Sequence, residues 1–185
     1  AASPRREHEG IYHAERFEAD GRSLQVILLD TRSFRDPLKR TGESPLPPFK
    51  NEYKPTPDRG TALLGEEQWE WLEATLREPA DLRVIATSIQ FGHSYNGWES
   101  WTLIPGERRR MISLIRSTAA EGVVFISGDV HWGEINRQRA AGMYPLYDVT
   151  ASGINQDWDV IEPSSRRVGP AVSEHNVGWI EVDWA

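Results

Sequence analysis

Three short apolar segments alternate with two amphipathic helical patterns along the chain, and this alternation is the feature that most restricts the fold. A strand, helix, strand, helix, strand order with largely apolar strands is typical of parallel β-α-β units, whose crossovers are right-handed. The sequence therefore predicts an α/β fold with three parallel strands in one sheet. The predicted strands cover residues 26–30, 83–89 and 123–128, the predicted helices cover residues 65–79 and 105–122, and the proline-rich residues 34–60 are predicted to form a long irregular loop.

Further strands are predicted on both sides of this pattern. Residues 11–19 and 23–30 are joined by an Asp-Gly pair at 20–21, where glycine tolerates a positive φ, so we expect a β-hairpin. Two later segments, residues 144–152 and 177–184, have the composition of strands and are expected to be antiparallel.

Length, charge and cysteine content narrow the class of protein. The chain has 185 residues, the size of one domain, and its 28 acidic and 21 basic residues give a net charge of -7. That charge argues against a broad nucleic-acid surface. No apolar run approaches the roughly 18 residues of a membrane span, and no apolar signal segment opens the sequence, so the compartment stays open. The chain has no cysteine, so any metal must bind oxygen and imidazole.

Polar residues directly follow each of the three predicted parallel strands. Ligands of open α/β sheets bind outside the carboxyl ends of the strands, so we expect these polar side chains to converge on one edge. The three groups are Asp30-Thr31-Arg32, Ser88-Ile89-Gln90 and Asp129-Val130-His131.

Asp129 and His131 are the clearest candidates for metal binding. Positions i and i+2 just after a strand let both side chains turn toward one point, where they offer a carboxylate and an imidazole to a divalent or trivalent ion. Two ligands do not complete a site. The alternative interpretation is an aspartate that caps a turn beside a hydrogen-bonded histidine.

Other catalytic frameworks find little support. The sequence has no G-x-S-x-G nucleophile elbow, no phosphate-binding G-x-x-x-x-G-K loop and no H-E-x-x-H motif. Pairs of carboxylates for glycoside hydrolysis are available, but a chain this acidic offers such pairs in any case. The acidic residues concerned are Glu99, Glu134, Asp148 and Asp157.

Five strings occur in a fixed order along the chain: VILLDTRSFRDP, LLGEEQWEWLEATLREPADLRVIATSIQF, GWESW with PGERRRMISLI, GVVFISGDVHWGEI and YPLYDVTASGINQ. Together they resemble the C-terminal part of the PhoD-like metallophosphatases, the alkaline phosphatase D family. The resemblance covers nearly the whole chain. It implies that residues 1–185 are the C-terminal portion of a single PhoD-like domain.

The resemblance implies a fold and an activity. The fold would be that of the calcineurin-like metallophosphoesterases, an α/β mixed-sheet sandwich flanked by helices, with its C-terminal half present here. The activity would be hydrolysis of phosphomonoesters or phosphodiesters at a centre of two or more metal ions, drawn from Fe, Ca, Zn, Mn and Mg. Gly128 to His131 occupy the place of the G-H-x-H motif of the wider superfamily, so Asp129 and His131 would each face a metal.

The sequence also departs from the family pattern. Family members carry an N-terminal half with further aspartate motifs, and none of these motifs occurs in this chain. The resemblance therefore implies a companion for the chain, either a separate polypeptide or the other product of a cleavage. It also allows a secreted or periplasmic location.

Four residues are candidates for binding the substrate, beginning with Arg32 and Gln90. Arg32 at the strand edge would give two hydrogen bonds to a phosphoryl group, or else form a structural ion pair with Asp30 or Asp36. Gln90 lies where the superfamily often has a metal-binding histidine. It would contact the substrate or a metal-bound water, or else make a hydrogen bond within its loop.

The other two candidates are Trp98 and Asn155. Trp98, together with Trp101, would line a pocket for the leaving group, or else both rings would simply pack their loop. Asn155 follows a predicted strand and would reach the site, or else form a turn.

The remaining singled-out residues are expected to be structural. His93 is expected to be exposed on a glycine-rich loop, and residues 107–110 (ERRR) are expected to form a solvated helix face. The residues expected in the core are Trp69, Trp71, Met111 and Ile115.

Three functional hypotheses follow from the sequence. The first is a metal-dependent phosphoric ester hydrolase in which Asp129 and His131 hold metal ions. The second is a non-catalytic half-domain that completes a partner chain through an uncovered edge of its sheet. The third is a sugar-binding domain that uses Trp98 and Trp101 as stacking platforms.

Overall fold

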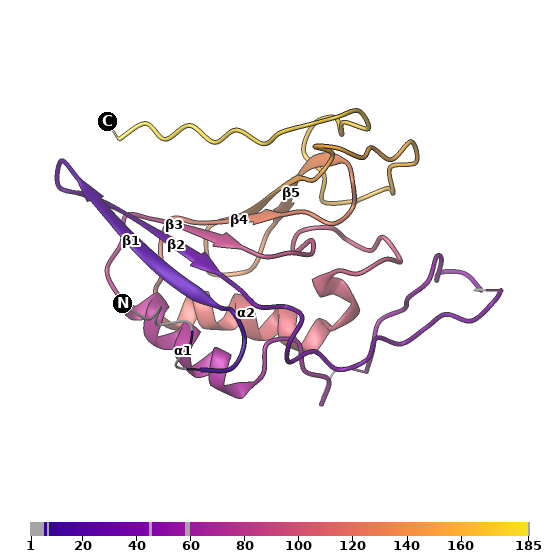
Figure 1. Ribbon diagram of the computed structural model, residues 1–185, viewed down its shortest axis with the longest axis horizontal. Helices are drawn as coiled ribbons and strands as arrows, with labels where there is room; N and C mark the ends of the chain where they lie inside the picture. Colours follow the sequence, from indigo (N-terminus) through magenta and orange to yellow (C-terminus); the bar gives the residue numbers. More distant parts are fainter. Residues whose placement is uncertain (1–5, 7, 45, 58–59, 185) are drawn as a thin grey trace.

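A six-stranded mixed sheet with two helices on one face forms the centre of the computed structural model (Figure 1). The structure describes residues 6, 8–44, 46–57 and 60–184. The strand order in the sheet is β1-β2-β3-β4-β6-β5. In chain order the elements are β1 (His13–Ala19), β2 (Arg22–Leu28), α1 (Glu66–Arg77), β3 (Leu82–Ala86), the short 3-10 helix η2 (Trp101–Leu103), α2 (Pro105–Ser117), β4 (Val123–Ser127), β5 (Gly133–Gln138) and β6 (Leu146–Ala151).

The parallel core of the sheet confirms the alternation seen in the sequence. β2 pairs with β3 and β3 pairs with β4, both in parallel, while β1 and β2 form the predicted antiparallel hairpin. The register pairs Leu28 with Ala86 and Ala86 with Ile126, so the three parallel strands end almost level. The loops that follow them therefore leave from the same edge of the sheet.

The strand predicted within residues 144–152 is present, but its predicted antiparallel direction is right only toward β5, which was missed. β6 is parallel to β4 and antiparallel only to β5, which forms an edge of the sheet. β5 was not predicted because the burial of its side chains is the reverse of what their polarity suggests. Ile135, the one large apolar residue of the strand, is 42% exposed, whereas Glu134 and Asn136 are buried.

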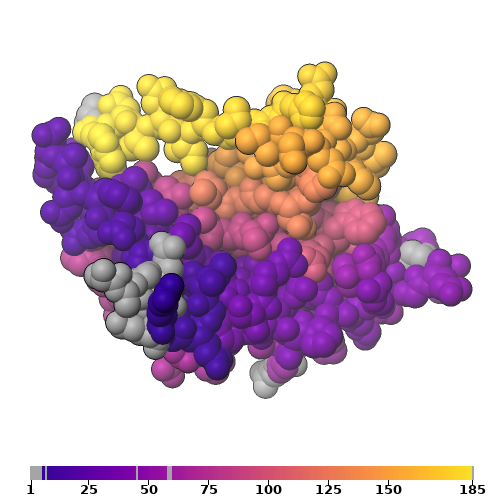
Figure 2. Space-filling view, viewed as in Figure 1, coloured from indigo at the N-terminus to yellow at the C-terminus, as the bar shows by residue number. Residues whose placement is uncertain are grey.

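The strand predicted at residues 177–184 was also wrong. This segment is extended but belongs to none of the strands of the sheet (Figure 1). It crosses the face of the sheet opposite the helices, and because it lies over a face rather than along an edge, it cannot continue the hydrogen-bond ladder. Its end is held where Arg22 Nη2 donates a hydrogen bond to the carbonyl oxygen of Trp184 at 2.9 Å. In the space-filling view the C-terminal residues form the outermost layer on that side (Figure 2).

The hydrophobic core lies between the sheet and the two helices. Three of the predicted core residues, Trp69, Met111 and Ile115, are fully buried, and Trp71 is half-buried against Tyr12, with ring centroids 4.7 Å apart. Each large apolar side chain buried in this way contributes about 1.5–3 kcal/mol to folding. The inward residues of the strands include Ile27, Ile85 and Phe125.

Residues 107–110 form the solvated helix face that the charges suggested only in part, since Arg109 is exposed and Arg110 is half-buried. Glu107 and Arg108 are buried. Glu107 accepts hydrogen bonds from two backbone N–H groups of the loop before α1 and from Trp69 Nε1. Arg108 donates to Gln138 Oε1 at 2.7 Å, and burial lowers its pKa to about 9. The first turn of α2 therefore faces the protein, since its charges find partners there.

The face of the sheet opposite the helices carries a wide apolar groove. The groove has a volume of about 570 Å³ and runs between the strands and the C-terminal segment. The strand residues that line the groove include Leu28, Val84, Ala86, Ile126, Val149 and Ala151, and Gly178 and Ile180 line it from the C-terminal segment.

None of the helices in the described ranges has the length and hydropathy of a membrane span.

Candidate active site

The loops that follow β2, β3 and β4 meet at one edge of the sheet, as the sequence predicted. The hydroxyl groups of Thr31 and Ser88 are hydrogen-bonded to each other across the ends of β2 and β3. Arg32 Nη2 lies 3.4 Å from Asp129 Oδ1, which joins the ends of β2 and β4. The level register of the strands brings these residues together although they lie far apart in the sequence.

Asp129 and His131 occupy an unusual backbone conformation. Their φ angles are 76° and 65°, in the left-handed region that non-glycine residues rarely adopt. Residues held there cost on the order of 1–3 kcal/mol and cluster at active sites. The backbone N–H of His131 donates to Ser152 Oγ at 2.9 Å, which ties this turn to the end of β6.

The side chains of Asp129 and His131 have the chemistry of metal ligands. Burial raises the pKa of Asp129, and the charge of Arg32 partly offsets this effect. His131 Nδ1 is buried and has no hydrogen-bond partner. A buried imidazole nitrogen beside a carboxylate suits a metal ion as a partial ligand set. Among the residues described by the structure, no three His, Asp or Glu side chains form a group that would hold a metal ion.

Two arginines and a glutamate surround Asp129. Glu99 pairs with Arg32 and, at 2.8 Å, with Arg35. Burial raises the pKa of Glu99, but the hydrogen bonds and charges of the two arginines outweigh burial and leave this pKa lowered. The predicted pairing of Arg32 with a carboxylate is therefore present, although the partners are Glu99 and Asp129 rather than Asp30 or Asp36. This site can present a guanidinium group beside a carboxylate that is available to a metal.

Asp30 serves the backbone instead of the site. Its carboxylate accepts hydrogen bonds from the backbone N–H groups of Ile11, Arg32 and Ser33 and from the Ser33 hydroxyl. Burial raises the pKa of Asp30, and these hydrogen bonds outweigh it, so the pKa lies below its usual value. Asp30 thereby holds the turn from which Arg32 leaves.

A pocket of about 270 Å³ adjoins the Asp129 and His131 side chains. It contains the predicted candidate Trp98, whereas Trp101 is fully buried in the core, where its ring packs edge-on against Phe91. The residues that line the pocket are Glu52, Tyr53, Trp98, Glu99, Asp129, Val130, His131, Trp132 and Trp158.

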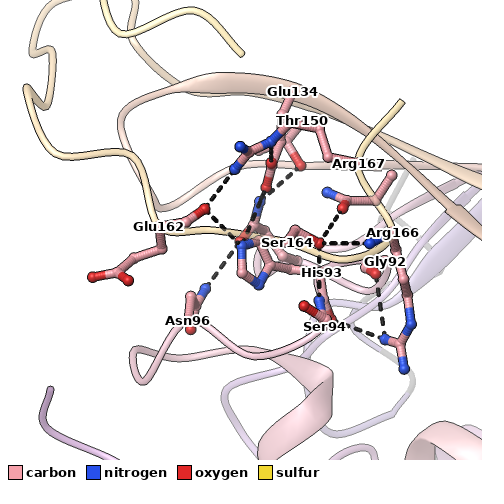
Figure 3. A network of polar contacts seen from close by, with 12 residues as sticks. Gly92, His93, Ser94, Asn96, Glu134, Thr150, Glu162, Ser164, Arg166 and Arg167 are labelled. Carbon is pink, nitrogen blue, oxygen red and sulfur yellow. Dashed lines mark hydrogen bonds and ion pairs between the residues drawn. The ribbon is translucent and has the colours of Figure 1, made fainter. Parts of the chain in front are cut away.

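Gln90 is hydrogen-bonded to Asn96, Glu134 and Thr150, which belong to a buried polar network (Figure 3). Its amide nitrogen donates to Glu134 Oε1 at 2.6 Å and to Thr150 Oγ1 at 3.1 Å, and its oxygen accepts from Asn96 Nδ2 at 2.9 Å. The side chain is fully buried. The bond to Asn96 is the hydrogen bond within the loop that the sequence had offered as one of two interpretations, and the other two bonds reach β5 and β6.

His93 belongs to the same network and corrects the expectation of an exposed loop residue. It is fully buried, with Nε2 3.8 Å from Glu134 Oε1. Burial lowers the pKa of His93, and the charge of Glu134 opposes this effect. Arg167 Nε lies 2.5 Å from Glu134 Oε2. A histidine on a glycine-rich loop is buried here because β5 supplies the carboxylate that pairs with it.

Asn155 is exposed on the loop after β6. The sequence missed several residues around the pocket. Tyr53 comes from the proline-rich loop and gave no signal, while Trp132 directly follows His131 and was available as a signal. Glu99 was considered only as a member of a glycosidase pair, whereas the structure makes it the partner of two arginines.

Comparisons with known proteins agree with this geometry. Alkaline phosphatase D of Bacillus subtilis (strain 168) is 34% identical over 120 residues, which cover 60% of this chain and 20% of that protein. A solved structure of PhoD superposes with a TM-score of 0.57 at 26% identity, over 77% of this chain and 28% of the other. The chain therefore spans about a fifth of the length of the curated relative that it matches.

A second solved structure is similar in fold only. GAP50, described as the anchor in the inner membrane complex of Plasmodium, superposes with a TM-score of 0.51 at 14% identity, over 90% of this chain and 45% of the other. The mixed sheet with its helices and the match to PhoD confirm the calcineurin-like α/β fold. The profile of the PhoD-like phosphatases matches residues 3–161, and the chain belongs to the PhoD-like phosphatase family.

Proposed function

We propose that the chain supplies part of the active site of a metal-dependent phosphoester hydrolase that acts on phosphomonoesters or phosphodiesters. The observation that carries the proposal is the pair Asp129 and His131, held on left-handed backbone at the carboxyl edge of the sheet, with Arg32 3.4 Å from the aspartate. Membership in the PhoD-like family supports the reaction class.

Asp129 and His131 would hold the metal centre, which in the proposal contains two or more ions. A carboxylate oxygen and an imidazole nitrogen are compatible with Fe, Zn and Mn, and the carboxylate also suits Ca and Mg. When bound, the metal stabilises the charge that develops on the phosphoryl group and supplies a nucleophile near neutral pH. His131 is prepared for this role because its buried Nδ1 has no competing partner.

Arg32 would bind the phosphoryl oxygens of the substrate. Its planar guanidinium already spans Glu99 and Asp129, and it is the group best suited to give two parallel hydrogen bonds to a phosphate. Trp98 would contact the substrate from the adjoining pocket. Asn155 would approach the substrate from its exposed loop. Gln90 would position Trp98 indirectly, because it is hydrogen-bonded to Asn96, whose Oδ1 accepts from the Trp98 N–H.

The remaining metal ligands would come from polypeptide outside these residues. We infer that a companion segment of the same domain, as a separate chain or a cleaved fragment, packs on the face of the sheet opposite the helices. The apolar groove of about 570 Å³ between that face and the C-terminal segment supports this inference, because its strand side chains stay partly exposed and exposed apolar surface favours association. This chain spans only about a fifth of the length of the curated relative, which is consistent with a companion segment.

Metal analysis of two variants of the intact protein tests the proposal. We expect Asp129→Asn and His131→Ala to lose metal and to lose most hydrolysis of bis(p-nitrophenyl) phosphate while folding normally, because each removes a direct ligand. Asp20→Asn in the exposed hairpin turn and His175→Ala on an exposed loop are the matched controls. Normal metal content with lost activity would refute the ligand assignment, and no hydrolysis by the purified wild-type protein with its full complement of metal would support a non-catalytic half-domain.

A further inference from the structure

Four aromatic side chains from four separate segments converge on the pocket beside Asp129. They are Tyr53, Trp98, Trp132 and Trp158, and together they make up four of its nine lining residues. A pocket walled by aromatic rings next to a few polar groups is typical of a small-molecule site. Simple packing of a core would bury all four rings, yet Trp158 is 42% exposed and Tyr53 and Trp98 are only half-buried.

The two loops that carry Tyr53 and Trp98 are joined to each other by hydrogen bonds. The N–H of Tyr53 donates to the carbonyl oxygen of Gly97 at 2.8 Å, and Asn51 Nδ2 donates to the carbonyl oxygen of Asn96 at 2.7 Å. Gly97 has a φ of 77°, and a Cβ added there would overlap the carbonyl oxygen of Lys50. The two loops therefore approach more closely than any side chain would allow, which fixes the two rings at the pocket.

The other two rings of the lining are a buried one and an accessible one. Trp132 is 1% exposed, so its position is set by the surrounding protein. Trp158 approaches His131 edge-on, with ring centroids 6.3 Å apart. An aromatic ring of a bound ligand would thus lie close to the residues that we assign to the metal. It would occupy the position of a group attached to the reacting phosphorus.

Both glutamates of the lining form ion pairs, whereas the buried nitrogens His131 Nδ1 and Trp132 Nε1 have no hydrogen-bond partner. Glu99 is paired with Arg32 and Arg35, and Glu52 is paired with Arg40. A sugar would need free acceptors for its several hydroxyl groups, and the ion pairs occupy both glutamates. A flat aromatic ring needs only the faces and edges of the four side chains.

The geometry points to this pocket as the subsite for an aromatic ring in the leaving group of the phosphoester. The inference rests on the proposed hydrolase function and specifies its substrate class as esters of aryl or heteroaryl alcohols, or of alcohols that carry such a ring near the ester oxygen. Hydrophobic contact and stacking against Tyr53, Trp98 and Trp158 would supply the preference.

Binding of two phosphonates to the intact, metal-loaded protein tests the inference without relying on turnover. We expect phenylphosphonate to bind about tenfold or more tightly than methylphosphonate by calorimetry, since a stacked ring is worth that much in comparable sites. Trp158→Ala and Trp98→Ala should each reduce this ratio several-fold. Trp179→Ala is the matched control, because Trp179 is 85% exposed and lies outside the pocket. In that control the ratio should stay unchanged.

The outcomes separate the subsite from the hydrolase proposal. Equal affinity for the two phosphonates, or a ratio that the pocket variants do not lower, would overturn the aromatic subsite even if phosphoesters are hydrolysed. If the ratio of the two phosphonate affinities depends on Trp98 and Trp158 but the protein hydrolyses no phosphoester, the aromatic subsite would be supported and the hydrolase function refuted. Tighter binding of glucose 6-phosphate than of phenylphosphonate would show that the rings recognise a sugar, and would also overturn the inference.

Discussion

Arg32 bridges two carboxylates at the edge of the sheet, with Nη2 3.4 Å from Asp129 Oδ1 and Nη1 paired with Glu99. Its guanidinium is about half exposed, so a phosphate group can approach it from solvent. A metal ion on Asp129 would compete with Arg32 for the same carboxylate, which would release Nη2 toward a substrate oxygen. In this arrangement Glu99 keeps the arginine in place while one of its two partners changes.

We expect Arg32→Ala to lower kcat/KM for phosphoester hydrolysis by about ten- to a hundredfold, since a hydrogen bond to a charged group contributes roughly 1.5–3 kcal/mol. The free energy of unfolding should change by less than about 1 kcal/mol, because the Arg32 side chain is about half exposed and Glu99 keeps its pair with Arg35. Steady-state kinetics and urea unfolding measure the two quantities. Arg77→Ala, which breaks the exposed pair with Glu73 on α1, is the control. Kinetics of Arg32→Ala equal to those of Arg77→Ala would rule out contact with the phosphate.

Gly97→Ala should destabilise the protein more than a glycine substitution with similar backbone strain and free space. The matched control is Gly142→Ala, at a φ of 75° with no atom within 4 Å of the added Cβ. In both variants an alanine in the left-handed backbone conformation destabilises the fold by about 1 kcal/mol, but Gly97→Ala must also displace the Lys50 carbonyl. Thermal unfolding compares the two. Equal melting temperatures for both variants would show that the loops of Tyr53 and Trp98 can separate freely.

Glu134→Ala should lower the free energy of unfolding by about 3 kcal/mol or more, because it leaves buried partners without their carboxylate. Burial raises the pKa of Glu134, but the charge of His93 and the bonds from Arg167 and Gln90 outweigh burial and leave it lowered. Glu73→Ala on the exposed face of α1 should cost about 0.5 kcal/mol or less. Urea unfolding of both variants measures the difference. A similar small loss in the two variants would mean that the network of Figure 3 does not stabilise the fold.

Asp148→Asn should change the pH dependence of stability. Burial raises the pKa of Asp148 to about 6, with hydrogen bonds from the Gly92 N–H, Ser127 and the Phe91 N–H partly offsetting this effect. A carboxyl whose pKa is raised on folding stabilises the protein below its unfolded pKa and loses this contribution as the pH rises through the folded value.

Asparagine accepts the same two backbone N–H groups and donates to Ser127, without a charge to bury. Relative to wild type, the unfolding free energy of Asp148→Asn should therefore rise by up to about 3 kcal/mol between about pH 4 and pH 7. Urea unfolding across this range tests the expectation. Parallel pH curves for the two proteins would contradict the raised pKa of Asp148.

The order of apolar strands and amphipathic helices determined the central architecture from the sequence alone. Alternation of strands with crossovers favours parallel pairing, so the convergence of Arg32 and Asp129 on one edge was predicted, although the ion pair between them was not. The position of Asp129 and His131 was equally local, since residues two and four positions after the end of β4 stay close to its edge.

Only the tertiary structure decided which polar residues are buried and where the later segments lie. β5 has an exposed isoleucine and a buried glutamate, and its place beside β6 depends on Gln90, His93 and Arg167, which lie distant in the sequence. The C-terminal segment alternates like a strand, yet it rests on a face of the sheet. The physical reason is the same in both cases: local periodicity reports which side of a segment is apolar, whereas pairing of buried charges and the choice between edge and face depend on partners that no local pattern contains.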